Sequence, residues 1–140
     1  KIQGKVINFI QAVEEICAKD SRYKPEGYEF VSQALTFTRK KMKKPGHITG
    51  RELSEGMRDF AIDQYGPMAK SVLRHWGIHK TEDFGHIVFN LIEKKIFFKT
   101  ENDSVDDFKG VYDFDSAFSN AMEKIFLRKK TAKKSLQSST

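Results

Sequence analysis

Apolar residues recur at intervals of three and four along much of this chain, which is the spacing of one face of an α-helix. The first such run covers residues 4–19 and ends at Asp20-Ser21. The second run begins at Pro25 and continues to about Lys43, where Pro45-Gly46 stops it. Proline suits the first turn of a helix because that turn does not use the missing N–H group. The pattern therefore predicts two amphipathic helices joined by a short polar turn.

Two more helices are predicted from signals at their ends. Thr49 and Glu52 have the spacing of a capping box, in which the two side chains bond free amides reciprocally, and a third helix follows them. Gly66-Pro67 then supplies a helix stop and a helix start in adjacent residues. A short fourth helix is therefore predicted from this point to Gly77.

A fifth helix and a β-hairpin are predicted for the next part of the chain. Thr81 is the predicted N-cap, and apolar residues at helical spacing continue to about Lys95. Ile96-Phe97-Phe98 and residues 111–114 are short β-prone runs that a polar, acidic connection separates. These runs predict a hairpin with a long loop near residues 96–114.

Three helices followed by a hairpin is the order of a winged helix-turn-helix, so residues 50–114 are predicted to be winged-helix-like. The predicted recognition helix begins with Glu82 and Asp83, however, whose charge would repel a phosphate backbone. If the winged shape forms, we expect it to contact a protein rather than to read bases in the major groove.

Asp115 or Ser116 is the predicted cap of a last helix, which passes through Phe126. Together these patterns predict a mainly α protein. Residues 1–127 are expected to form a single helical domain of about six helices with a small β-hairpin, and residues 128–140 are expected to form a basic, flexible tail.

The composition favours one folded domain in a reducing compartment. A chain of 140 residues suits a single core, and twelve Phe, four Tyr and one Trp supply large apolar groups to fill it. Cys17 is the only cysteine, so no disulfide can form within the chain. No run approaches the ~20 apolar residues of a membrane span, and no segment has the pattern of a signal peptide. We therefore expect a cytoplasmic protein with no membrane association.

The charges are segregated along the chain. Residues 1–50 carry a net charge of +5, residues 51–127 carry −4, and residues 128–140 carry +5. Two basic blocks, at 39–44 and 128–134, account for this asymmetry. Such blocks face a polyanion or solvent. Part of the first block also stabilises the end of the second helix, because cations favour the negative pole of the helix dipole.

Few residues suggest metal or nucleophile chemistry. Acidic residues of the 101–115 segment offer oxygen ligands for Ca²⁺ but lack the EF-hand spacing, so solvated loop acids are the favoured interpretation. His75 and His79 are four residues apart, as zinc ligands on one helix face would be, but Gly77 lies between them. Cys17 is interpreted as a small buried hydrophobe rather than a nucleophile. The acidic residues are Glu101, Asp103, Asp106, Asp107, Asp113 and Asp115.

No enzyme motif is present in the sequence. It contains no Gly-x-Ser-x-Gly elbow, no Gly-rich phosphate loop and no dinucleotide fingerprint. Trp76, Phe84, Phe89 and Phe97 offer a stacking platform for bases, but their helical spacing favours a place in the core.

Several runs of this sequence resemble a small family of bacterial proteins of similar length. The resemblance spans about residues 10–118 and implies a bacterial cytosolic origin and one shared fold. It implies no active site, cofactor or partner, and the tail beyond Phe126 lies outside it. The runs are Tyr28-Glu29-Phe30-Val31, His47-Ile48-Thr49-Gly50-Arg51-Glu52-Leu53, Tyr65-Gly66-Pro67-Met68-Ala69, Trp76-Gly77-Ile78, residues 81–92, and residues 107–114.

Within these runs, Arg51, Arg58, His86 and Asn90 have no role in capping or in an apolar face. They are therefore the predicted interaction surface. An ion pair from Arg58 to a neighbouring acid, Glu55 or Asp59, is the structural alternative for that residue.

The leading hypothesis from the sequence is a non-enzymatic cytosolic accessory protein that binds structured RNA through its basic blocks. Among the RNA-binding roles, association with the ribosome is favoured. No cofactor or metal is expected. The alternative is a protein-interaction or regulatory adaptor without a nucleic-acid role, in which Trp76, Phe89 or Phe97 would be exposed. An enzyme or metal protein using the acidic loop is least favoured. The candidate RNA-binding residues are Arg39, Lys40, Lys41, Lys43, Lys44, Arg128, Lys129, Lys130, Lys133 and Lys134.

Overall fold

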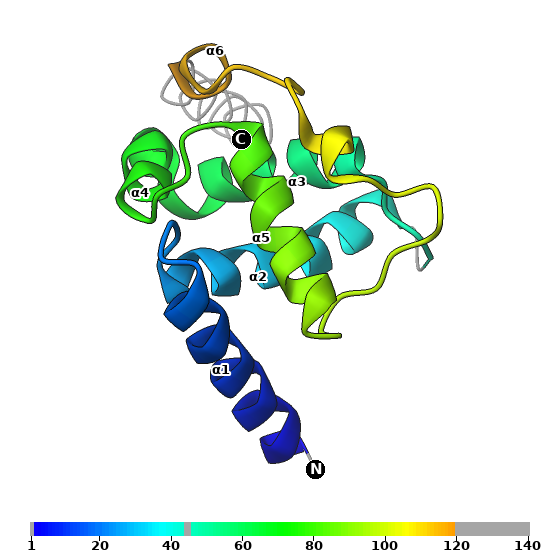
Figure 1. Cartoon of the computed structure of the whole chain (residues 1–140). Helices are drawn as coiled ribbons and strands as arrows, with labels where there is room; N and C mark the ends of the chain where they lie inside the picture. The colour runs from blue at the N-terminus through cyan, green and yellow to red at the C-terminus, as the bar shows by residue number, and fades with distance from the viewer. Residues whose placement is uncertain (1, 44–45, 120–140) are drawn as a thin grey trace, which may run out of the picture.

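The described part of the chain is predominantly helical, as the apolar periodicity predicted. The computed structural model describes residues 2–43 and 46–119, and of residues 2–7 the backbone alone. In chain order the elements are α1 (Ile2–Lys19), α2 (Pro25–Met42), α3 (Gly50–Tyr65), the 3-10 helix η1 (Gly66–Met68), α4 (Ala69–His75), α5 (Thr81–Glu93), the 3-10 helix η2 (Val105–Phe108) and α6 (Phe114–Ser119) (Figure 1).

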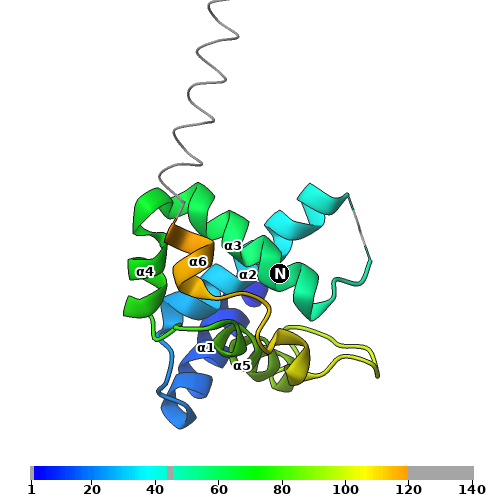
Figure 2. The same ribbon diagram turned by 90° about the horizontal axis from the view of Figure 1, so that it is seen from above.

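Helices α2, α3 and α5 surround the core. Their facing sides bury large apolar residues completely, because each helix presents one apolar stripe to the others. Helix α4 and helix α6 pack beside each other at one end of the body (Figure 2). The largest fully buried apolar side chains are Tyr28, Phe84, Met57, Leu73, Ile78, Ile87, Leu91 and Val31.

Helix α1 is attached to the body by its C-terminal half. Val13 and Ile16 are buried, whereas Ile10 is 52% exposed, and the N-terminal end of the helix projects away from the body (Figure 1). An ion pair of 2.6 Å between Lys94 Nζ and Glu15 Oε1 joins the end of α5 to this helix.

Two close approaches need residues without a side chain. A Cβ atom on Gly56 of α3 would lie 1.9 Å from Thr38 Oγ1 of α2, so glycine is what permits these helices to cross here. A Cβ atom on Gly85 of α5 would lie 2.9 Å from Phe108 Cβ. Phe108 is 3% exposed, and it anchors η2 against the core.

The predicted β-hairpin is wrong: the described residues contain no β-strand. The amides of Ile96 and Phe97 donate to the Leu91 carbonyl, at 2.9 and 3.2 Å, so this run folds back on the end of α5. The Val111 amide donates to Thr81 Oγ1 at 3.2 Å. Each β-prone run therefore bonds to a helix instead of to the other run. The hairpin that would form the wing of a winged helix is absent from the described residues.

Helix α2 begins at Pro25 as predicted, and of the three predicted N-caps one is right and two are displaced. Glu52 N donates to Thr49 Oγ1 and Thr49 N to Glu52 Oε1, at 3.1 and 2.9 Å, which confirms the capping box of α3. Thr81 is not the N-cap of α5, because Lys80 occupies that position.

Helix α6 begins at Phe114 rather than after Asp115 or Ser116. The carboxylate that accepts from its first turn is that of Asp113, which receives the Ser116 amide at 3.1 Å. The predicted continuation of this helix through Phe126, and the tail at 128–140, lie outside the described residues.

None of the helices in the described ranges is both long and apolar enough to cross a membrane.

Candidate binding groove and basic surface

The first basic block forms the last turn of α2 and the residue that ends it. Arg39, Lys40 and Lys43 are exposed, and none of them forms an ion pair with a described carboxylate. Lys43 has a left-handed backbone with φ +52°, and its amide donates to the Lys40 carbonyl at 3.2 Å. The last turn of α2 therefore presents three cations to solvent. Lys44, Arg128, Lys129, Lys130, Lys133 and Lys134 lie outside the described residues.

Lys41 differs from its neighbours because it is held by the protein itself. Its Nζ atom lies 2.6 Å from Asp59 Oδ2, and it also lies 5.9 Å from the centroid of the Phe37 ring. Burial raises the pKa of Asp59, but the hydrogen bond from Lys41 and the nearby Arg58 outweigh it, so the pKa is lowered overall. Asp59 stays ionised at neutral pH and pairs with Lys41, but it shares its single charge with Arg58.

Two of the four predicted surface residues have ion-pair partners nearby in sequence. Arg58 Nε lies 3.1 Å from Asp59 Oδ1, and its guanidinium lies 5.6 Å from the Tyr112 ring centroid. The structural alternative for Arg58 is therefore confirmed. Arg51 lies 3.7 Å from Glu55 one turn along α3 and keeps 72% of its side chain exposed. His86 is half-buried on α5.

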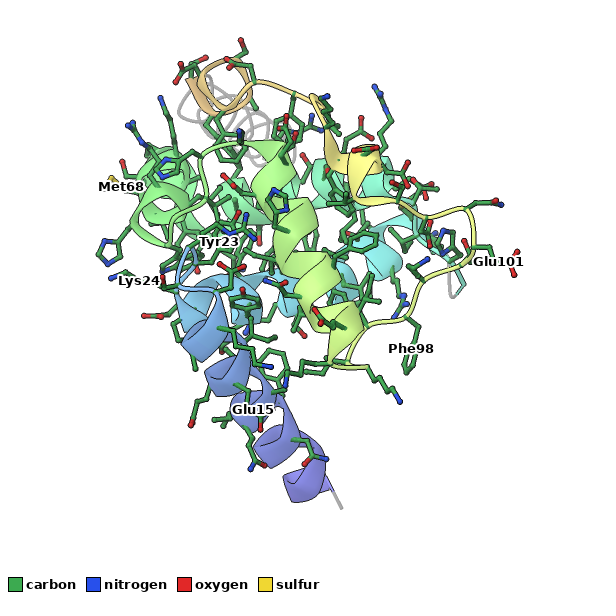
Figure 3. All side chains as sticks on the ribbon, viewed as in Figure 1. Glu15, Tyr23, Lys24, Met68, Phe98 and Glu101 are labelled. Carbon is green, nitrogen blue, oxygen red and sulfur yellow. The ribbon has the colours of Figure 1, made fainter. Side chains whose placement is uncertain are left out.

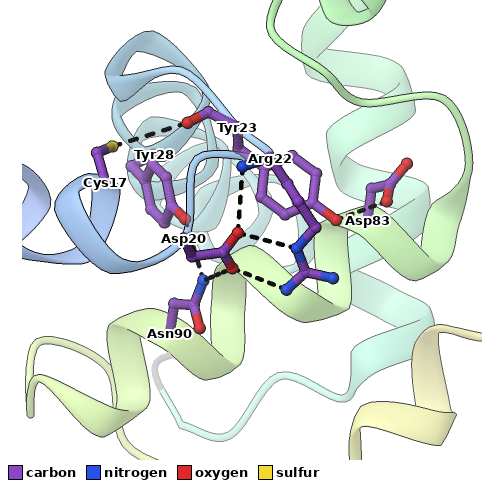
Figure 4. A network of polar contacts seen from close by, with 7 residues as sticks. All are labelled: Cys17, Asp20, Arg22, Tyr23, Tyr28, Asp83 and Asn90. Carbon is purple, nitrogen blue, oxygen red and sulfur yellow. Dashed lines mark hydrogen bonds and ion pairs between the residues drawn. The ribbon is translucent and has the colours of Figure 1, made fainter.

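Asn90 belongs to a polar network that fastens the turn after α1 onto α5 (Figure 4). Its Nδ2 atom donates to Asp20 Oδ2 at 3.1 Å and to the Tyr28 hydroxyl oxygen at 3.0 Å. Arg22 donates to both oxygens of Asp20, at 2.9 and 2.7 Å, and holds the pKa of that carboxyl well below its usual range. Asn90 is thus a structural residue, and its partners could not be identified from local sequence.

Burial and the surrounding network also affect Tyr28, which lies on the first turn of α2 and belongs to this network. Burial raises the pKa of Tyr28 to about 12, although the hydrogen bond from Asn90 acts in the opposite direction. The neutral phenol is therefore the form that the folded protein stabilises.

A concave cavity of about 440 Å³ opens between α2, α5 and the segment that follows α5. One wall of the cavity is a single face of α2, because Leu35, Thr36 and Arg39 follow Ser32 at intervals of three, four and seven residues. The lining residues are Ser32, Leu35, Thr36, Arg39, His47, Ile48, Gly50, Leu53, Val88, Phe89, Ile92, Ile96, Phe97, Phe98, Lys99, Asp103, Ser104, Asp107 and Phe108. We call this cavity the α2–α5 groove.

The edge of the α2–α5 groove carries an exposed aromatic residue and two exposed cations. Phe98 is 83% exposed and projects from the segment after α5 (Figure 3). Lys99 follows it, and Arg39 lies on the α2 side. Neither cation pairs with a carboxylate in the described ranges, so both are available to an anion.

The acidic residues of the groove are engaged by the protein. Asp103 Oδ1 lies 3.0 Å from His47 Nε2, and its Oδ2 accepts the Thr100 amide at 2.8 Å. Asp107 Oδ2 accepts the Ser104 amide at 2.9 Å. These contacts support the interpretation of the acidic segment as loop and cap residues. The described residues contain no group of three or more His, Cys, Asp and Glu side chains that could hold a metal ion.

The remaining candidates for chemistry lie apart from the groove. His75 ends α4 and His79 follows Gly77, whose φ of +92° breaks the helix, so the two histidines do not share a helix face. Cys17 is partly buried and its Sγ atom lies 3.7 Å from the Tyr23 carbonyl oxygen. Burial raises the pKa of this thiol, which lowers its content of reactive thiolate.

A second cavity of about 290 Å³ adjoins α4 and the start of α6. Its charges oppose one another, because Lys70 and Arg74 face Asp113 and Asp115. The Lys70 ammonium bonds directly to Asp115 and lowers the pKa of that carboxyl. This cavity therefore offers little net charge to a ligand.

The predicted aromatic set divides between the core and the groove. Trp76 is 9% exposed and Phe84 is fully buried, so the core interpretation is confirmed for these two rings. Phe89 and Phe97 are partly buried and line the groove. Phe98 and Lys99 were not predicted as surface residues, because Phe98 was assigned to a strand of the predicted hairpin and Lys99 to the loop that follows it.

Comparisons with protein-family models, curated proteins and solved structures found no match to this chain.

Proposed function

We propose that this protein is a non-enzymatic, cytoplasmic accessory protein that binds structured RNA, in association with the ribosome, through the end of α2. The observation that supports this proposal is the exposure of Arg39, Lys40 and Lys43, which have no described carboxylate as a partner. Lys41 contributes less, because its ammonium is paired with Asp59. In the same proposal the basic segment 128–134, outside the described residues, adds five cations.

The expected mode of binding is contact with phosphates rather than reading of bases. Cations on one helix end neutralise backbone charge and give affinity with little sequence preference. Structured RNA suits this mode because proteins recognise its helices mostly through their shape and through contacts to phosphates, without reading the bases. Asp83 at the start of α5 is buried and accepts a hydrogen bond from Tyr23. This carboxylate therefore stabilises the fold and is not a contact for RNA.

The test is the affinity of the full chain for a fluorescent RNA hairpin, measured by anisotropy across a salt series. We expect the variant Arg39→Ser/Lys40→Ser/Lys43→Ser to bind more weakly and to reduce the slope of log K against log salt by about three, because about three phosphate contacts are removed. A second variant replaces the five cations of 128–134 with serine and is expected to add to this effect.

A matched control removes the same charge from separate places. Lys19, Lys80 and Lys109 are exposed on three different segments, and their triple replacement by serine should change the affinity much less. An equal loss of RNA affinity in the two triple variants would show that only the net charge of the protein matters. That result would contradict a binding surface at the end of α2. No binding by the unaltered chain at low salt would remove the RNA proposal altogether.

A further inference from the structure

Phe98 is the most exposed large apolar residue in the described part of the chain. Its side chain is 83% exposed, whereas every other aromatic side chain of the described residues is buried or half-buried. Figure 3 shows the ring projecting from the segment that follows α5. An exposed ring offers its face to a planar partner, which a ring inside the core cannot do. Phe98 is therefore free to stack on a flat group from outside the protein.

The backbone on both sides of Phe98 is held in place. The amides of Ile96 and Phe97 donate to one carbonyl at the end of α5, at 2.9 and 3.2 Å, and both side chains pack partly buried on the core. On the other side, the Thr100 amide donates to Asp103 Oδ2 at 2.8 Å. A ring on an anchored segment loses little conformational freedom when a ligand stacks on it, so this anchoring favours binding.

The α2–α5 groove beside Phe98 is lined by polar and apolar side chains in similar numbers. Its cations are Arg39 and Lys99, and two carboxylates, Asp103 and Asp107, belong to the same lining, so the charges of the groove largely cancel. This mixture favours neither an ion nor a purely apolar ligand. A nucleobase suits it better, because a base is uncharged, has two flat faces that stack, and carries hydrogen-bond donors and acceptors on its edges.

The groove also connects Phe98 with the cations that are proposed to bind RNA. Arg39, one of the exposed cations in the last turn of α2, lines the groove together with Phe98. Lys99 follows Phe98 directly and is exposed as well. Stacking on one ring is too weak to hold a free base, so the base is expected to belong to a chain whose phosphates are bound nearby.

From this arrangement we propose that Phe98 stacks on an unpaired base of the bound RNA, while Arg39 and Lys99 contact the neighbouring phosphates. The proposal rests on the RNA binding proposed above and adds to it a preference for structured RNA with an unpaired nucleotide. Bases within a paired helix are covered by their neighbours, whereas an unpaired base exposes its faces. Stacking tolerates every base, so no sequence preference is expected.

The experiment compares two RNA hairpins that have the same stem and a bulge of equal length, made of adenines in one and of abasic nucleotides in the other. The two hairpins carry the same number of phosphates, so only the bases of the bulge differ. Anisotropy measures the affinity of the full chain for each. We expect the adenine bulge to be bound about five- to tenfold more tightly, because that factor is typical of one stacked base.

Variants of Phe98 test whether this ring is the one that stacks. Phe98→Ala should bind both hairpins with the affinity that the unaltered chain has for the abasic one. Phe98→Leu keeps an apolar side chain without a ring and should lose most of the preference, whereas Phe98→Trp should keep it. The matched control is Met68→Ala, which removes a side chain that is 59% exposed and lies outside the groove lining, and it should leave the preference unchanged.

Two further measurements separate stacking from an effect on the fold. Thermal unfolding of the Phe98 variants should match that of the unaltered chain, because the side chain is exposed. The emission of the Phe98→Trp variant should be quenched by the adenine-bulge hairpin and much less by the abasic one. The unaltered chain, which contains Trp76 alone, gives the background for this signal.

Four outcomes would overturn the proposal. Equal affinity of the unaltered chain for the two hairpins would exclude stacking and leave the phosphate contacts of α2, which the Arg39→Ser/Lys40→Ser/Lys43→Ser variant tests separately. A preference for adenine that persists in Phe98→Ala or is undiminished in Phe98→Leu would place the stacked base elsewhere. No binding of either hairpin at low salt would remove this proposal and the proposed function together. A sedimenting mass that rises with protein concentration, and stays monomeric in Phe98→Ala, would assign Phe98 to a contact with a second copy of the chain.

Discussion

The phenol of Tyr23 donates a hydrogen bond of 2.6 Å to Asp83 Oδ1, and this contact joins the turn after α1 to the first turn of α5. The second oxygen of Asp83 accepts the amides of His79 and Lys80, at 2.8 and 3.2 Å. Asp83 is 8% exposed, so three donors satisfy a nearly buried carboxylate. One side chain therefore closes the start of a helix and fixes a distant turn.

Asp83→Ala is expected to lower the free energy of unfolding by about 2 kcal/mol, because it leaves buried donors without an acceptor. Tyr23→Phe should lower it by about 1 kcal/mol. Urea unfolding of both single variants and the double variant measures the coupling between them. The neighbouring Glu82→Ala is the control and should change stability by less than about 0.5 kcal/mol. Strict additivity of the two single effects would show that the 2.6 Å contact contributes nothing.

Asp20 makes the stability of the fold depend on pH in the acid range. Its folded-state pKa lies below the unfolded value of about 3.9, so the ionised group stabilises the fold above about pH 4, and this stabilisation is lost as the pH falls through the folded-state pKa. Asp20→Asn should therefore be less stable than the unaltered chain at pH 7, by about 1 kcal/mol, and the difference should shrink below about pH 4.

Thermal unfolding at a series of pH values measures this difference. Asp63→Asn, on the exposed side of α3, is the matched control. An Asp20→Asn difference that stays constant from neutral to acid pH would mean that the ion pair with Arg22 has no influence on stability.

Two buried glycines of the central helices should respond oppositely to alanine. Gly56→Ala places a methyl group against Thr38 and is expected to lower the free energy of unfolding by about 1–3 kcal/mol. At Gly27 the nearest atom would be 3.5 Å from the new methyl carbon, which is an ordinary contact. Gly27→Ala should therefore raise stability by up to about 1 kcal/mol, through helix propensity. Urea unfolding measures both, and equal effects would contradict the described crossing of α2 and α3.

Lys41 and Arg39 lie two residues apart but should contribute unequally to RNA binding. Lys41→Ser removes a cation that is already paired with Asp59, so we expect the affinity for the RNA hairpin to fall by less than about twofold. Arg39→Ser removes an exposed cation without a described partner and should weaken binding several-fold. The same anisotropy assay measures both variants at one salt concentration. A greater loss for Lys41→Ser would show that its pair with Asp59 opens on binding. Stability should change by less than about 1 kcal/mol in Lys41→Ser, as for exposed ion pairs.

The features that the sequence predicted correctly are local ones. Apolar spacing predicted the helices because the period of a helix is set within a few residues. The capping box at Thr49 was predictable for the same reason, since both partners lie in one turn. The β-prone runs were predicted wrongly for two reasons. The amides of Ile96 and Phe97 bond to the Leu91 carbonyl, so a local contact at the end of α5 competes with a strand. The Val111 amide bonds to Thr81, thirty residues away, an acceptor that only the packed chain brings near.

For the candidate site, the sequence by itself determined where the cations are, and tertiary structure decided which of them are available. Lys41 and Arg39 are equivalent in sequence, but only Lys41 has a carboxylate of α3 within reach. No single segment forms the groove either, because α2, α5 and the residues after α5 each supply one part of its wall. Helix periods and formal charges are properties of neighbouring residues, whereas partners and cavities depend on distances between residues that only the packed chain brings together.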